Sequence, residues 1–170
     1  FRLVESFSIK DNLTLSKSNI YKDDFKTAYQ KYSEIFALNV REDEIVFNLS
    51  VGEKQKIEIM KLIFNNSNIM LLDEPTAVLT PQETLQLKNS LLTLAKEDMK
   101  TIVLITHKLK EIREFTESVS VMRNGKMVSN DLLTQEVSDN ELINLMMGEV
   151  QKSQVNKNND IGDVKLDVKS

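Results

Sequence analysis

The sequence lacks cysteine and tryptophan, and its 170 residues include one histidine, four glycines and two prolines. Without cysteine the chain can form neither a disulfide nor a thiolate metal site. One histidine argues against a metal centre built from several imidazoles. The scarcity of glycine and proline predicts long helices and few tight turns.

Long apolar runs and an excess of positive charge are also missing. No run approaches the roughly 20 apolar residues that cross a bilayer, and no signal sequence is visible, so we expect a cytoplasmic protein. The net charge of −4 gives no support to a nucleic-acid partner, which would favour a clustered basic surface. Hydrophobic residues at 41% and charged residues at 28% are typical of one soluble globular domain.

A glycine-rich phosphate loop of the form Gly-x-x-x-x-Gly-Lys-Ser/Thr occurs nowhere in the sequence. Such a loop binds phosphates through a cradle of backbone N–H groups. The 170 residues therefore lack the loop that makes the first contact with ATP in proteins that contain such a loop.

A helical pattern begins after residue 22, whereas residues 1–20 have few helical signals. Asp23 and Asp24 can begin a helix. Ser50 can cap a second helix that ends in the turn-forming residues 65–68. The first of these helices has apolar residues at three- and four-residue spacing, as one buried face requires: Phe25, Ala28, Tyr29, Tyr32, Ile35 and Phe36.

Strands and helices alternate after residue 68. The continuous apolar runs Ile69–Leu72 and Thr101–Thr106 predict strands that are buried on both faces of a parallel sheet. Thr80, Pro81 and Glu83 form the pattern of a capping box with proline at the first helical position, which predicts the start of the intervening helix. Alternation of this kind indicates an α/β fold.

A hairpin and a last helix are expected towards the C-terminus. Asn124–Gly125 is the strongest hairpin signal in the chain, and it joins the strands predicted over residues 119–122 and 126–128. Asp139 is the expected cap of a helix over residues 141–147.

Two adjacent carboxylates, Asp73 and Glu74, follow the strand predicted over Ile69–Leu72. Open α/β sheets place ligand chemistry at the carboxyl ends of their strands. There an aspartate can hold Mg²⁺, which prefers oxygen ligands, and a glutamate can activate water as a general base. Taken alone, the pair is more often a strand that ends in a solvated acidic turn.

The segment Leu49–Glu53 combines a serine, a glycine and a helix start. Gly52 has no Cβ and lets a phosphate approach the backbone. Ser50 offers a hydroxyl, and the helix directs free N–H groups towards an anion. In isolation, these five residues are more often an ordinary serine-capped helix start.

The single histidine, His107, follows the second predicted strand and could donate a hydrogen bond to a γ-phosphate. By itself, a histidine in that place is more often a polar edge residue. However, a glycine motif at a helix start, a strand-borne Asp-Glu pair and a strand-end Thr-His pair occur here in one chain and in this order. Together they indicate a nucleotide site.

These motifs resemble those in the ATP-binding subunits of ABC importers, most closely the importers of simple sugars and nucleosides. The resemblance is carried by residues 49–83, LSVGEKQKIEIMKLIFNNSNIMLLDEPTAVLTPQE. LSVGE resembles the signature motif, LLDE the Walker B strand, AVLT the D-loop and ITHK the switch histidine. The resemblance implies an α/β fold, an incomplete ABC-type P-loop NTPase sheet with a helical signature subdomain.

The resemblance, which covers nearly the whole chain, also implies a division into domains. Residues 1–65 would be the ABC helical subdomain, and residues 66–148 the C-terminal part of the RecA-like ATPase core. Residues 149–163 are polar and aperiodic, as expected of a linker. Residues 164–170 alternate like a strand and resemble the opening strand of a second ATP-binding domain. Because the phosphate-loop strand of this family lies inside the sheet, we expect a sheet that lacks a central strand.

For the strand-end residues the resemblance implies catalytic roles. Asp73 would hold Mg²⁺, and Glu74 would be the catalytic base. His107 would contact the γ-phosphate and position the attacking water.

For the signature segment the resemblance implies contact with the γ-phosphate of an ATP molecule held by an opposing domain. Val51 stands where many members have glycine, Glu53 replaces the commoner glutamine, and Thr80 stands where the D-loop usually has aspartate. The residues expected to bind ATP in this way are Leu49, Ser50, Val51, Gly52 and Glu53.

The implied function is that of the energy-coupling ATPase subunit of an ABC importer for a simple sugar or nucleoside. Its cofactors would be ATP and Mg²⁺ in the intact parent. Its partners would be transmembrane permease subunits, a second nucleotide-binding domain in cis or on a partner chain, and indirectly a solute-binding protein, with no nucleic acid. Such a subunit is cytoplasmic and peripheral on the inner face of the cell membrane.

Two other interpretations of the function are compatible with the sequence. The first is a soluble ABC ATPase that acts on translation or DNA, although such proteins carry long helical insertions or basic tracts. The second is a non-catalytic fragment with a regulatory or interaction role, or with no activity. Because the phosphate loop is missing, we expect the chain by itself to be inactive.

Overall fold

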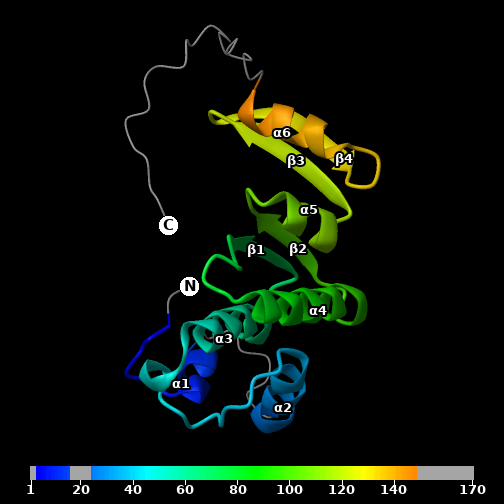
Figure 1. Cartoon of the computed structure of the whole chain (residues 1–170). Coiled ribbons are helices and arrows are strands. Elements are labelled where there is room, and N and C mark those ends of the chain that lie inside the picture. Colours follow the sequence, from blue (N-terminus) through cyan, green and yellow to red (C-terminus); the bar gives the residue numbers. More distant parts are fainter. Residues whose placement is uncertain (1–2, 16–23, 149–170) are drawn as a thin grey trace, which may run out of the picture. The chain divides into compact units, whose positions relative to one another are not determined.

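The structure is a computed structural model that describes residues 3–15 and 24–148 (Figure 1). The predicted linker over residues 149–163 and the predicted strand over residues 164–170 lie outside the described residues. Contacts divide the chain into two compact units, the first ending at Thr116 and the second beginning at Glu117. Each unit is described by itself.

The first unit begins with helices. They are α1 (Ile9–Thr14), α2 (Phe25–Ile35), the short 3-10 helix η1 (Val46–Asn48) and α3 (Val51–Phe64). Helices α2 and α3 agree with the sequence pattern.

Helix α1 was not predicted. Its signal is a short capping box in which Ser8 Oγ accepts a hydrogen bond from the Asp11 N–H at 3.0 Å. A six-residue helix with Ile9 and Leu13 fully buried shows too little periodicity to be recognised from sequence.

The α/β part of the first unit follows, with β1 (Ile69–Asp73), α4 (Pro81–Glu97), β2 (Thr101–Ile105) and α5 (Leu109–Phe115). Strands β1 and β2 are parallel, and Asp73 lies opposite Ile105. The predicted α/β fold with a parallel sheet is confirmed. The predicted cap of α4 is also confirmed, because Thr80 Oγ1 accepts from the Glu83 N–H and the Glu83 carboxylate accepts from the Thr80 N–H.

One face of the β1–β2 sheet is buried and the other is open. Met70 and Leu72 are 1% and 6% exposed, whereas Leu71 is 67% exposed. The prediction that both strands are buried on both faces is therefore wrong for these residues. Parallel strands are usually covered by helices on both faces, and here only one face has a cover within the described part. The large apolar side chains of the open face are Ile69, Leu71, Val103 and Ile105.

The second unit contains β3 (Ser118–Arg123), β4 (Lys126–Leu133) and α6 (Asp139–Met147). The two strands form a separate antiparallel sheet of two strands. The predicted hairpin is confirmed, with positive φ angles of 51° at Asn124 and 72° at Gly125. The predicted cap is off by one residue, because Ser138 and not Asp139 accepts the capping hydrogen bond.

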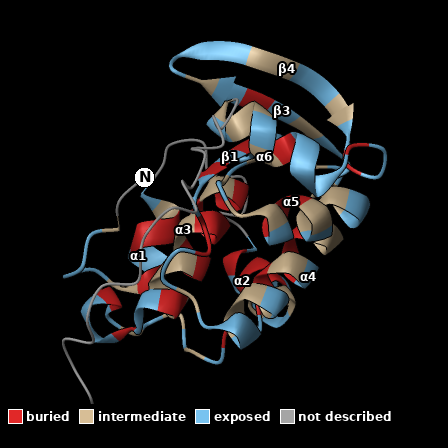
Figure 2. Cartoon of the chain, turned by 45° about the horizontal axis from the view of Figure 1, so that its top comes forward, coloured by how far each residue is buried: buried red, intermediate tan, exposed pale blue. Residues whose placement is uncertain are grey.

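The hydrophobic core of the first unit is built from both its helical and its α/β parts. Figure 2 shows buried segments along α3 and α4. Phe64, at the end of α3, packs against Phe25 and Tyr32 of α2 with ring centroids 5.4 and 6.1 Å apart. The same buried cluster includes Met70 of β1 and Leu94 of α4. The core thereby fixes the position of β1 against the signature helix α3.

Asp98, the C-cap of α4, joins that helix to α2. Its carboxylate accepts hydrogen bonds from Tyr32 at 2.9 Å and from Lys31 at 2.8 Å. Burial raises the pKa of Asp98, but these hydrogen bonds outweigh burial and hold the pKa below its ordinary value.

We expect this carboxylate to make the first unit sensitive to acid. A depressed pKa contributes stability above the unfolded-state pKa of about 4, and this contribution is lost as pH falls through the folded-state pKa. Asp98→Asn should remove about 1 kcal/mol of stability at pH 7 and reduce the loss of stability that occurs as the pH falls below about 4. Urea unfolding at several pH values measures both effects in this chain joined to a segment that completes its sheet. The control is Asp43→Asn, which breaks an exposed pair with Arg41; equal acid sensitivity in the Asp98 variant and the wild type would contradict the expectation.

Candidate functional site

Glu74 directly follows β1 and has an unusual backbone conformation. Its φ angle is 44°, in the left-handed region that residues other than glycine adopt rarely. Its N–H donates to the Ile105 carbonyl at 2.9 Å, so the end of β1 is joined to the end of β2. Strained residues of this kind are found preferentially at functional sites.

The side chain of Glu74 meets His107, which lies two residues beyond the end of β2. His107 Nδ1 is 2.8 Å from Glu74 Oε1. The Glu74 side chain is 46% exposed and the His107 side chain is 67% exposed, so solvent can reach both. Two parallel strands that end together at the same sheet edge account for this approach. A carboxylate in contact with an imidazole can accept a proton from water, and the imidazole can donate a hydrogen bond to an anion.

Asp73 is the last residue of β1 and is exposed. Among the described residues, no cluster of three or more acidic, histidine or cysteine side chains could hold a metal ion by itself. Mg²⁺, however, is usually held by one or two carboxylates together with phosphates and water. The single Asp73 carboxylate fits an Mg²⁺ ion that arrives with phosphates.

The signature segment Leu49–Glu53 begins α3 with a capping box that was not predicted. Ser50 Oγ accepts from the Glu53 N–H at 3.3 Å, and both the N–H and the hydroxyl of Ser50 donate to the Glu53 carboxylate at 2.8 Å. The carboxylate of Glu53 therefore lies at the positive end of the helix, which is the position that an anion would take. A phosphate that approached the Ser50 hydroxyl would compete with this carboxylate.

Gly52 is buried, and the space beside its Cα is already taken. A Cβ at this position would clash with Glu83 Oε1 and would lie 3.4 Å from Leu79 Cδ2. The glycine thus permits a close approach, although in this structure the approaching group is a side chain at the start of α4. In the described part of the chain, no hydrogen bond or ion pair joins Leu49–Glu53 to Glu74 or His107.

Sequence reasoning missed a partly buried polar cluster in the loops that carry Glu74 and His107 and in the helix that follows. It consists of Thr76, Thr106, Lys108 and Glu111, and we call it the Glu111 network. The signal in the sequence is weak, because a glutamate in a short helix is normally read as a solvated residue. In the structure Glu111 is only 5% exposed.

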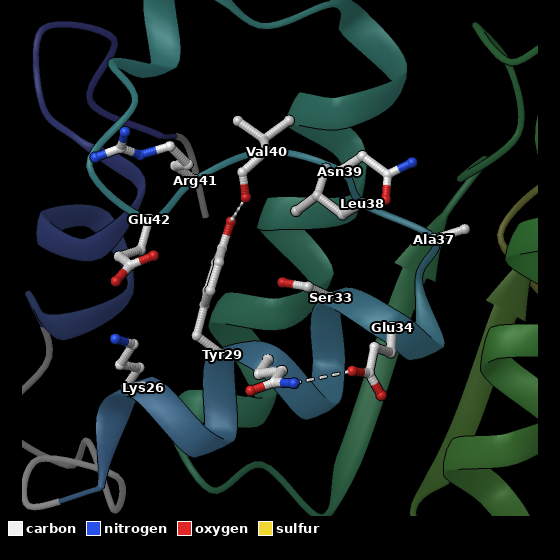
Figure 3. Close-up of a pocket in the computed structure, with 11 residues that line it drawn as sticks. Lys26, Tyr29, Ser33, Glu34, Ala37, Leu38, Asn39, Val40, Arg41 and Glu42 are labelled. Carbon is white, nitrogen blue, oxygen red and sulfur yellow. Dashed lines mark hydrogen bonds between the residues drawn. The ribbon is translucent and has the colours of Figure 1, made fainter.

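A groove of about 560 Å³ lies elsewhere in the first unit, beside α2 and the chain that follows it (Figure 3). Tyr29 crosses it and donates a hydrogen bond to the Val40 carbonyl at 2.7 Å. Burial raises the pKa of Tyr29. The groove is lined by charges of both signs, including Lys26, Arg41 and Glu42. None of the residues predicted to bind nucleotide lines it.

Comparisons with known proteins agree with the family that the motifs resemble. Residues 2–77 match the model of the ABC transporter family. The nucleoside import ATP-binding protein NupA of Lactococcus lactis subsp. cremoris is 39% identical over 154 residues, which are 87% of this chain and 30% of NupA. The ribose import ATP-binding protein RbsA of Caldanaerobacter subterraneus subsp. tengcongensis is 34% identical over 86% of this chain and 30% of RbsA. The chain thus spans about a third of the length of these relatives.

Solved structures of ABC proteins have the same fold as this chain. The ATP-binding cassette MJ0796, in a dimeric post-hydrolysis state bound to ADP and Pi, matches with a TM-score of 0.65 at 22% identity. The match covers 78% of this chain and 59% of that cassette. An ABC transporter in an inward-facing conformation matches with a TM-score of 0.71 over 85% of this chain and 60% of its own, also at 22% identity. Within the described residues, no helix is both long and apolar enough to span a membrane.

Proposed function

We propose that this chain, which carries part of an ABC transporter ATP-binding domain, supplies the signature segment and the hydrolytic residues of an ATPase. The proposed ATPase drives an importer for a simple sugar or nucleoside. The observation that supports this most directly is the contact between Glu74 and His107 at the ends of two parallel strands. The names of the relatives support the importer class, since they include import ATP-binding proteins for nucleosides and for ribose.

In the proposed reaction, Glu74 accepts a proton from the water that attacks the γ-phosphate. His107 donates from Nδ1–H to this carboxylate and, in its doubly protonated form, donates from Nε2–H to the γ-phosphate. General-base catalysis by a positioned carboxylate contributes about 10²–10⁴ to a rate. Both side chains are exposed at the sheet edge, so water and nucleotide can reach them.

Asp73 is the proposed contact for Mg²⁺, which would neutralise the charge that develops on the phosphates. Its carboxylate lies at the end of β1, one residue before the proposed base. Because one carboxylate alone holds Mg²⁺ weakly, the ion is expected to bind together with ATP.

The residues Leu49–Glu53 are proposed to bind the γ-phosphate of an ATP molecule that a second, opposing nucleotide-binding domain holds. The N-terminus of α3 provides the positive end of a helix dipole for this contact. Glu53 must leave its present position or be neutralised by a cation when the phosphate arrives, because its carboxylate occupies that end of the helix.

The proposed assembly contains two such domains and transmembrane permease subunits, with a solute-binding protein acting through the permease and no nucleic acid. The proposed location is the cytoplasmic face of the cell membrane. ATP would bring the two domains together and hydrolysis would separate them, which would move the attached permease. The first helices of the chain would transmit this movement.

We expect the 170-residue chain on its own to bind Mg-ATP too weakly to measure. It lacks the phosphate loop and therefore the N–H cradle and lysine that hold the phosphates. Isothermal titration calorimetry with Mg-ATP tests this, and a dissociation constant in the micromolar range would contradict it. As a positive control, we define the completed domain as this chain preceded by a segment that contains a strand, a phosphate loop and a helix. The completed domain should bind and hydrolyse Mg-ATP, and failure to hydrolyse it would overturn the proposed function.

A further inference from the structure

The Glu74–His107 contact needs an explanation, because an exposed ion pair contributes little stability by itself. Glu74 is 46% and His107 is 67% exposed, and each lies on a loop that follows a strand. Side chains under these conditions do not usually hold one geometry. Other contacts must therefore hold the two loops that carry these side chains.

Glu111 of α5 contacts both of these loops. One oxygen of its carboxylate, Oε1, accepts a hydrogen bond from the Thr76 hydroxyl. The other oxygen, Oε2, accepts one from the Thr106 hydroxyl at 2.7 Å. Thr76 is two residues after Glu74, and Thr106 is the residue before His107. A single carboxylate thus joins the loop after β1 to the loop after β2.

The position of Glu111 is unusual for a charged side chain. Glu111 is 5% exposed and Thr76 is 2% exposed, so the carboxylate lies in a region where an unpaired charge would be strongly unfavourable. Lys108 Nζ compensates the charge at 3.0 Å from Oε1 and also donates to the Thr76 hydroxyl at 2.9 Å. Burial raises the pKa of Glu111, but the hydrogen bonds that it accepts outweigh burial and hold this pKa below its ordinary value. The carboxylate is therefore ionised at neutral pH.

The two threonines have no freedom to reverse their hydrogen bonds. Thr106 Oγ1 accepts from the Lys108 N–H at 3.1 Å, so its hydroxyl proton is directed to Glu111. Thr76 Oγ1 accepts from Lys108 Nζ, so its proton is also directed to Glu111. Glu111 and Thr76 are buried and Thr106 and Lys108 are partly buried, and a network in which every buried polar group has a partner is rigid and specifies one geometry.

We propose that Glu111 is the positioning residue that brings Glu74 and His107 together by joining the two loops that carry them. The roles of Glu74 and His107 in ATP hydrolysis rest on the proposed function, but the join between the loops does not. Glu111 touches neither the water nor the nucleotide of the proposed reaction, and it acts only through the loops.

The test uses the nitrogen resonances of His107, recorded by NMR without nucleotide in the completed domain, with an added segment that contains no histidine. Glu74→Gln should shift the Nδ1 signal in the wild-type background, because it changes the hydrogen-bond partner of that nitrogen. In the Glu111→Gln background, the shift caused by Glu74→Gln should fall at least two-fold. Glu114→Gln on the same helix is the matched control, since the Glu114 side chain is 37% exposed and its ion pairs among the described residues are those with Lys88 and Lys110. It should leave the shift unchanged.

Two further variants keep the test decisive if Glu111→Gln does not fold, as judged by circular dichroism. Thr76→Val and Thr106→Val each remove one hydroxyl at nearly constant volume, and each should reduce the shift at least two-fold. An undiminished shift in folded Glu111→Gln, or in both threonine variants, would overturn the proposal. So would a wild-type His107 signal that does not respond to Glu74→Gln. Because no nucleotide is used, a failure of the proposed ATPase activity would leave these outcomes unchanged.

Discussion

Replacing Glu74 with glutamine in the completed domain is expected to lower kcat for ATP hydrolysis by about 10²–10⁴-fold. Glutamine has nearly the shape of glutamate and can still meet His107, but it cannot accept a proton from water. The affinity for Mg-ATP should change little, because the phosphates are held by other groups. A large fall in kcat at nearly constant affinity is the signature of an interaction that acts only in the transition state.

Phosphate release gives kcat for this comparison, and calorimetry gives the affinity. The control is Glu114→Gln, which makes the same chemical change on α5 away from the sheet edge. It should leave both quantities unchanged. Turnover at the wild-type rate in the Glu74 variant would remove Glu74 from its proposed role.

Leu71→Ala is expected to destabilise the completed domain by about 2–5 kcal/mol, the usual effect of truncating a buried leucine. In the 170-residue chain Leu71 is 67% exposed on the open face of the β1–β2 sheet, where a substitution normally changes stability by no more than about 0.5 kcal/mol. The two values differ because parallel sheets are covered on both faces. We expect the segment that carries the phosphate loop to provide the missing cover.

Chemical unfolding of the completed domain measures this loss. Met70→Ala is the matched control, because Met70 is the neighbouring residue on the buried face and is 1% exposed. It should destabilise the domain by a similar amount whether or not the open face is covered. An effect of Leu71→Ala below about 0.5 kcal/mol in the completed domain would show that the face stays open.

The same feature predicts that the 170-residue chain by itself unfolds without a sharp transition. Strand β2 pairs only with β1 in the described residues, and each buried backbone group without a partner costs about 1–3 kcal/mol. A few such losses are decisive against a total stability of about 5–15 kcal/mol. A cooperative thermal transition in monomeric material would contradict this expectation.

The sequence was sufficient for the elements with strong local signals. The strand before Asp73, the capping box at Thr80 and the hairpin at Asn124–Gly125 depend on neighbouring residues, and all three are confirmed. Ser50 and Glu53 form the same type of capping box as Thr80 and Glu83, with the same spacing of three residues. The prediction that Ser50 caps its helix is confirmed, whereas its reciprocal pairing with the Glu53 carboxylate was not predicted.

Two features could not be read from local pattern. The open face of the β1–β2 sheet could not be distinguished by sequence from a buried face, because Ile69–Leu72 is apolar on both faces. We expect that pattern in a sheet that is covered on both sides. The Glu111 network depends on contacts between residues up to 35 positions apart, which the folded chain brings together. The site residues themselves were found through the order of three motifs. Their catalytic roles remain predictions.

We propose that the signature segment of one domain and the Asp73–Glu74 pair of another complete the same ATP pocket. Sedimentation of the completed domain carrying Glu74→Gln, with and without Mg-ATP, tests it most directly. We predict a monomer without nucleotide and a dimer with Mg-ATP. Adding Val51→Glu should abolish the dimer but not ATP binding. The control Met127→Glu on β4 should leave the dimer intact. A domain that binds Mg-ATP and stays monomeric, or a dimer that tolerates Val51→Glu, would contradict the claim.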